Sequence, residues 1–142
     1  MRIEVLPKMP KGTELSRPTK THFGGGHGYT PGRPKPRAGI TGPLKLPIAQ
    51  RILILEITNP DPLFPRTCTV SGTLNEGHWF TIESADSRVT LKPSGKVILQ
   101  LTALKAGNGS YARSLFSWEL EVEVRERRVE GVYVHVWAVE EG

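Results

Sequence analysis

The sequence predicts an all-β fold, a single small antiparallel sandwich or barrel that carries a long extended N-terminal arm. Seven segments after residue 50 alternate apolar and polar residues or run apolar, with turn residues between them, and none has helical periodicity. The first fifty residues hold eight of the 12 prolines and eight of the 15 glycines, and too few apolar residues for a core. We therefore divide the 142 residues into an arm, 1–49, and a β domain, 50–142.

The arm is strongly basic. It holds nine of the 19 Lys and Arg residues and two of the 14 acids, a charge of +7, whereas the β domain has the remaining ten cations and 12 acids, a charge of −2. A basic tail can contact nucleic acid or an acidic protein surface equally well. Cys68 is the only cysteine, which excludes an intrachain disulfide and is typical of assembly in a reducing compartment. We find no apolar run of membrane-spanning or secretion-signal type, and expect a soluble protein with no membrane partner.

The arm contains two short apolar alternations. The first, Ile3 and Val5, lies at the start of the arm and predicts either one short strand added to a sheet edge or a frayed terminus. From Pro10 to Thr21 the proline and polar content predicts extended chain. The second alternation, 44–48, predicts a strand that docks before the domain proper.

A glycine-rich stretch, HFGGGHGY, lies in the middle of the arm. Phosphate-binding glycine loops open a helix, but the prolines that follow this stretch prevent one. Its two histidines lack a third metal ligand at a suitable spacing. We expect a hinge with two aromatic anchors, Phe23 and Tyr29, followed by a polyproline stretch that holds Arg33, Lys35 and Arg37 apart.

The predicted strands of the domain are, in order, 51–58, 67–74, 78–83, 88–91, 96–104, 116–125 and 129–139. The first is apolar on both faces, as expected for a strand covered on both sides, and the proline-rich run NPDPLFP ends it. In the third, Phe80 and Ile82 are expected to face the core and Trp79 to lie outward or at the rim. The sixth alternates most strictly, which predicts an antiparallel strand with one solvated face.

The last strand carries the most informative side chains. One face is small and aliphatic, and the other carries Tyr133, His135 and Trp137. If the aliphatic face packs on the core, the aromatic stripe points outward and, with Trp79, predicts an oligomer or partner interface. The alternative is that the aromatic face is the core and the arm covers the valines.

Three glutamates form a row on the polar face of the sixth strand. Glu119, Glu121 and Glu123 repel one another unless a cation or a basic strand lies opposite. The row is either a solvated face or a docking surface for the basic arm of a neighbouring copy. A calcium site would need converging loop oxygens, which a row on one strand does not supply.

Catalytic signatures are missing from the sequence. No nucleophile motif surrounds a serine, no histidine has an acid or cysteine at a telling spacing, and there is no dinucleotide, zinc or kinase signature. Cys68 alternates with Val70 and Leu74, which predicts a buried, unreactive thiol. We predict a protein that is not an enzyme and has no cofactor or metal.

Nucleic-acid binding is a second hypothesis. The arm's cations, interleaved with Phe23 and Tyr29, could neutralise phosphates and stack bases. The β domain, however, is slightly acidic and has no groove-reading or single-strand motif.

The layout of the whole chain resembles the decoration, or cementing, proteins of tailed-phage capsids, in particular those of thermophilic siphophages. The shared features are a small cysteine-poor β domain, a long Pro/Gly arm and no catalytic signature. The resemblance implies a β-tulip or related fold and a thermostable homotrimer on the outer capsid surface of the virion, assembled in the host cytoplasm. It also implies the major capsid protein as partner, with arms that tie capsomers and copies of the protein together.

A second resemblance covers about residues 50–105. The stretches ITNP, 57–60, and VTLKPSG, 89–95, are similar to bacterial immunoglobulin-like domains, in which Asn-Pro ends one strand and a Pro-x-Gly turn precedes another. The first hypothesis is thus a non-enzymatic virion protein that stabilises a capsid by trimerising and clamping neighbours with its arm. The alternative is an immunoglobulin-like binding module whose basic arm contacts nucleic acid or another acidic partner.

Overall fold

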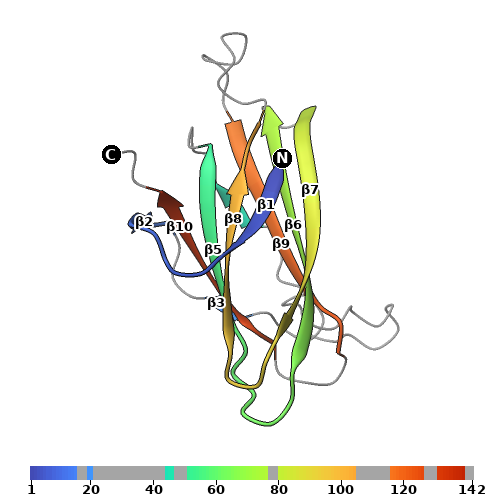
Figure 1. The fold of residues 1–142 in the computed structure, drawn as a ribbon. Coiled ribbons are helices and arrows are strands. Elements are labelled where there is room, and N and C mark those ends of the chain that lie inside the picture. Colours follow the sequence, from blue (N-terminus) through green and yellow to red (C-terminus); the bar gives the residue numbers. More distant parts are fainter. Residues whose placement is uncertain are drawn as a thin grey trace, which may run out of the picture.

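The computed structural model describes residues 1–15, 19–20, 44–46, 51–76, 80–104, 116–126 and 131–139. In these ranges the chain forms two antiparallel sheets that face each other (Figure 1). Neither sheet closes on itself in the described part, so the all-β prediction is confirmed in its sandwich form. The same ranges contain no helix long and apolar enough to cross a membrane.

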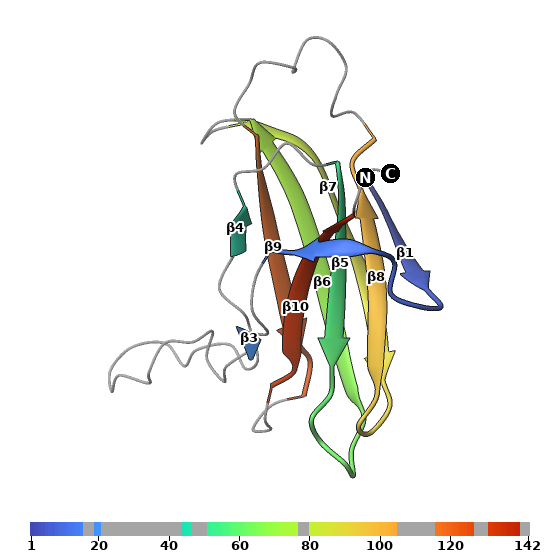
Figure 2. The same cartoon turned by 90° about the vertical axis from the view of Figure 1, so that its left-hand side faces the viewer.

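The first sheet, sheet A, contains the two ends of the described chain. Its strand order is β1 (Arg2–Leu6), β8 (Lys96–Thr102), β5 (Ile52–Thr58), β10 (Tyr133–Val139) and β2 (Gly12–Glu14), and β3 (Thr19–Lys20) also pairs with β10. The strands β1 and β2 thus lie at opposite edges. Figure 2 shows the chain between them crossing in front of β8 and β5, on the outer side of the sheet.

The second sheet, sheet B, has the order β4 (Leu44–Leu46), β9 (Phe116–Val124), β6 (Arg66–Glu76) and β7 (Phe80–Leu91). Strand β6 pairs with β7 along its full length and with β9 from Cys68 to Glu76. The chain passes from sheet A to sheet B between β5 and β6, and back to sheet A between β7 and β8.

The core lies between the sheets and follows from strand alternation. In β6 and β9 every second residue is buried, and the residues between them are partly exposed. The largest fully buried side chains are Trp118, Leu53, Ile54, Leu55, Ile57, Leu74, Leu91, Leu99, Leu101, Val70, Val122 and Val132. Leu53 and Ile54 point to opposite faces of β5 and both are fully buried, so the prediction that this strand is covered on both sides is confirmed.

Two predictions about the third and fourth strands are wrong. The segments 78–83 and 88–91 are not separate strands, because β7 is continuous from Phe80 to Leu91 and pairs with all of β6. The polar residues between them lie on an edge strand, where alternate side chains meet solvent at little cost.

The expectation that Phe80 faces the core is also wrong, since its side chain is 72% exposed. The β6–β7 register shifts by one residue after Leu74. The side chain of Glu83 accepts a hydrogen bond from the N–H of Leu104, which lies two residues beyond the end of β8. Phe80 lies three residues further along, where β6 and β7 extend beyond β1 and β5 (Figure 1). Ile82 is partly buried against the core, as expected.

The first 49 residues contribute four of these strands. The short strand predicted around Ile3 is present as β1, and the sheet edge that it joins belongs to its own chain. Strands β2 and β3 lie in the stretch predicted to be extended, and β4 lies in the second alternation. The amino group of Met1 is buried 3.1 Å from Oε1 of Glu83, which ties the start of β1 to β7.

Candidate partner-binding surfaces

The outer face of β10 carries the aromatic residues that the sequence singles out. The alternate aliphatic residues from Val132 to Ala138 are buried in the sandwich. Tyr133, His135 and Trp137 therefore lie on the outer side of sheet A, the arrangement on which the interface hypothesis depends. Tyr133 is 39% exposed, whereas His135 and Trp137 are more covered.

Strand β2 contributes to this cover. Its Glu14 is directly across from Trp137, and the Glu14 Oε2 lies 3.3 Å from Nε2 of His135. The rings of His135 and Trp137 are tilted by 39° with centroids 4.3 Å apart. The indole N–H of Trp137 is buried, and no described residue accepts a hydrogen bond from it. A buried donor without an acceptor costs free energy.

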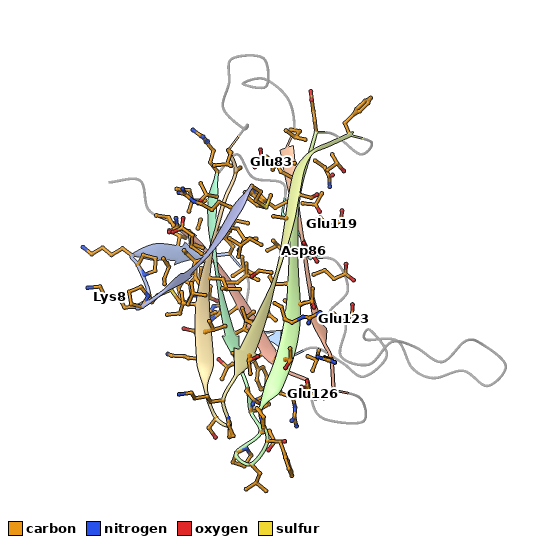
Figure 3. The ribbon with its side chains drawn as sticks, turned by 45° about the vertical axis from the view of Figure 1, so that its right-hand side comes forward. Lys8, Glu83, Asp86, Glu119, Glu123 and Glu126 are labelled. Carbon is orange, nitrogen blue, oxygen red and sulfur yellow. The ribbon has the colours of Figure 1, made fainter. Side chains whose placement is uncertain are left out.

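The acidic row lies on the opposite side of the molecule, on the outer face of sheet B. Figure 3 shows Glu119 and Glu123 along β9, on the same side as Asp86 of β7. The residues of β6 that face Glu119, Glu121 and Glu123 are threonines and a serine, which offer no positive charge. On the other side of β9, the register places Lys45 of β4 directly across from Glu119. The backbone of β4, from the N-terminal segment, thus lies beside the Glu119 end of the row.

Of the expected arm anchors, Ile3 and Val5 lie within the described ranges. Ile3 packs against the core, whereas Val5 is 64% exposed. The remaining anchors, and one residue of the expected interface, lie outside the described residues: Phe23, Tyr29, Arg33, Lys35, Arg37 and Trp79.

Cys68 is buried between the sheets with Val70 and Leu74, as the alternation predicts. Burial, together with the negative charge of Glu126, raises the pKa of its thiol to about 12. The thiolate needed for nucleophilic or metal chemistry is therefore strongly disfavoured. Within the described ranges, no three His, Cys, Asp or Glu side chains are grouped as metal ligands would be.

One exposed apolar surface of the described residues was not predicted from the sequence. Leu63 and Phe64, 74% and 61% exposed, lie next to each other in the loop that joins β5 to β6. In the sequence the run NPDPLFP marks only the end of a strand. Two large apolar residues in a loop that is otherwise proline and polar are the signal that could have indicated a contact site.

Comparison with known protein families, with curated proteins and with solved structures finds no match for this chain.

Proposed function

We propose that this chain is a non-enzymatic structural protein of a virion, which decorates and stabilises a capsid as a homotrimer and clamps neighbours with its N-terminal arm. The observation that supports the proposal is the way in which the N-terminal segment meets the sandwich. Its short strands pair with β8, β10 and β9, so that strands of both sheets accept N-terminal backbone. Backbone pairing gives an extended segment affinity without a core of its own.

Charge favours the same arrangement between copies. The arm carries +7 and the β domain −2, and the residues of β6 across from Glu119, Glu121 and Glu123 are uncharged. An arm from a neighbouring copy that followed β9 would place cations along the row.

The aromatic stripe is the second contact in the proposal. Tyr133 offers exposed aromatic surface, and the buried indole N–H of Trp137 lacks an acceptor among the described residues. A neighbour that packs on this face would bury the ring of Tyr133. Several weak contacts of this kind, made together by three arms, would give slow release.

Light scattering on a sizing column tests self-assembly with the full chain. We expect a particle with three times the mass of the 15.7 kDa chain. Charge reversal at the row, with Lys in place of Glu119, Glu121 and Glu123, should shift the particle towards monomer. The matched control is Glu4→Lys, on a partly exposed residue of β1 that already has a basic partner, Arg2. A monomer at every concentration would overturn the self-clamping proposal.

Co-sedimentation with shells of the major capsid protein tests decoration separately. We expect the wild-type chain to pellet with the shells and to protect them against heat. If the chain forms a trimer that does not pellet with the shells, self-assembly is supported and decoration is ruled out. A monomer that binds DNA with an affinity that falls steeply with salt would instead support the alternative, a binding module with a nucleic-acid-contacting arm.

A further inference from the structure

The loop between β5 and β6, residues 59–65, forms the extreme tip of one end of the sandwich. Figures 1 and 2 both show it extending beyond the neighbouring β7–β8 turn. Leu63 and Phe64 are its two exposed apolar side chains. They are adjacent, whereas Phe80 and Leu104, also exposed, belong to the opposite end of the molecule. We refer to Leu63 and Phe64 as the apolar tip.

The backbone that presents the apolar tip is held in one conformation. The buried side chain of Asn59 donates to the carbonyl oxygen of Phe64 at 2.9 Å and accepts from the N–H of Asp61 at 3.0 Å. Asp61 in turn pairs with the buried guanidinium of Arg66, which also donates to the carbonyl of Pro65 at 2.8 Å. A loop that is already ordered loses little conformational entropy when it binds.

Every backbone N–H donor of the loop is satisfied within the molecule. Three of its seven residues are prolines, which have no N–H. Leu63 and Phe64 donate to Oδ1 of Asp61, at 2.8 and 3.1 Å, and Asn59 donates to the carbonyl of Gly95 at 2.8 Å. The tip can therefore leave water without leaving a backbone donor unpaired, which lowers the cost of placing it at the bilayer interface.

Two exposed basic residues lie at the same end of the sandwich as the tip. The Asn59 side chain also bonds the carbonyl of Lys92, at 3.2 Å, so this exposed lysine lies beside the tip. Arg125, also exposed, lies at the same end, where its N–H donates to the carbonyl of Thr67 at 2.8 Å. Of the described carboxylates at this end, Asp61 pairs with Arg66 and Glu56 with Lys96, whereas Glu126 accepts a hydrogen bond from the N–H of Thr67 and keeps its negative charge.

We propose that the apolar tip is a peripheral membrane-contact site for a bilayer that contains anionic lipids. Leu63 and Phe64 enter the interface between headgroups and acyl chains, and Lys92 and Arg125 approach the lipid phosphates. A bilayer suits the tip better than a protein groove because the tip is convex, hides its backbone donors and has cations beside its apolar side chains. This inference goes beyond the proposed capsid function and stands independently of it.

Vesicle flotation with the full chain tests the proposal. The probes are vesicles of phosphatidylcholine alone and vesicles of phosphatidylcholine with phosphatidylserine. We expect the wild-type chain to float with the anionic vesicles, and the double variant Leu63→Ser/Phe64→Ser to lose about tenfold or more of this binding. The matched control is Phe80→Ser, which removes an equally exposed apolar side chain from the other end and should leave binding unchanged.

A second measurement reports on insertion directly. Leu63→Cys can be labelled with an environment-sensitive dye because Cys68 is buried and its thiol pKa is raised. Dye at the tip should shift to the blue on anionic vesicles and be quenched by brominated lipid, whereas dye at Phe80→Cys should not change. Binding that survives in the double serine variant and disappears in high salt would assign it to basic residues alone and overturn the proposal. Absence of vesicle binding by the wild-type chain would overturn it as well.

Discussion

The side-chain amide of Asn59 donates a hydrogen bond of 3.2 Å to the carbonyl oxygen of Lys92, 33 residues further along the chain. Asn59 follows β5 of sheet A and Lys92 follows β7 of sheet B, so a single amide joins two connections that cross between the sheets. Two backbone bonds reinforce the junction, from the N–H of Asn59 to Gly95 and from the N–H of Ser94 to Asp61, both 2.8 Å. Ser94 has a φ of 54°, the left-handed conformation with which the turn closes.

We expect Asn59→Ala to lower the free energy of unfolding by about 1–3 kcal/mol, because it removes the donor to the carbonyls of Phe64 and Lys92 and the acceptor for the N–H of Asp61. Denaturant unfolding measures this loss. The matched control is Asn75→Ala, since Asn75 is partly exposed and bonds Glu119 and Thr81 at the surface. Equal losses in the two variants would show that the junction does not contribute more than an ordinary surface bond.

The carboxyl group of Asp61 predicts an acid-dependent contribution to stability. Hydrogen bonds from the N–H groups of Leu63 and Phe64, and then the charge of Arg66, lower its pKa from the ordinary value of 3.8. Because its folded-state pKa is lowered, the Asp61 carboxylate binds a proton more tightly in the unfolded state than in the folded state. The contribution is therefore present above pH 3.8 and is lost as the pH falls towards the lower folded-state pKa.

Asp61→Asn should reproduce this loss at all pH values. We expect the difference in melting temperature between the wild-type chain and Asp61→Asn to be largest from about pH 5 upwards and to shrink below about pH 3. Thermal unfolding monitored by circular dichroism measures it. A difference that stays constant across this range would show that the charge of Asp61 does not support the loop.

Alternation in the sequence was sufficient to predict most of the sandwich. It identified the strand around Val122 by its strong period-two contrast, whereas the strand around Ile54 was identified by a continuous apolar run. For β10 it left two alternatives for the buried face, and the aliphatic one is the face that packs in the sandwich. The contrast in the strand around Val122 also placed the acidic row on an outer face. The exception is β7, whose inward residues include Ala85 and Ser87, so that burial there depends on pairing with β6 rather than on hydrophobicity.

What covers each face could not be predicted from alternation. The cover of Trp137 depends on β2, which is more than 120 residues away in the chain and has only three residues. Likewise, the turns at Asn59 and Lys92 are each visible in the sequence, but nothing local indicates that they meet. Such contacts depend on long-range pairing and on side-chain hydrogen bonds, which have no periodic signature.

The pairing of β2 with β10 depends on close approach at Gly12. A Cβ atom added to Gly12 would lie 2.5 Å from the carbonyl oxygen of Ala138, a backbone atom that cannot move aside easily. We expect Gly12→Val to displace β2, to lower the free energy of unfolding by about 1–3 kcal/mol and to increase hydrogen exchange at residues 137–139. Thr13→Val is the control, because Thr13 is exposed and keeps the same backbone pairing. Unchanged exchange in Gly12→Val would contradict the close approach.

Glu83 should be the most sensitive charged residue in the described part of the chain. Its Oε1 lies 3.1 Å from the amino group of Met1 and accepts a hydrogen bond of 2.7 Å from the N–H of Leu104, and its side chain is only 4% exposed. Removal of one partner from a buried ion pair leaves an uncompensated charge, so we expect Glu83→Ala to cost about 3–5 kcal/mol in denaturant unfolding.

The variant Glu83→Gln separates the charge of Glu83 from its hydrogen bond, and Glu4→Gln is the surface control. Glu83→Gln still accepts from Leu104 but no longer neutralises the amino group, so its loss should lie between those of Glu83→Ala and the wild-type chain. Glu4→Gln removes the exposed ion pair between Glu4 and Arg2 on the same strand as Met1, and should cost less than about 1 kcal/mol. If Glu83→Ala were as mild as Glu4→Gln, the amino group of Met1 would have to reach solvent, and β1 would not be fixed to β7 at this point.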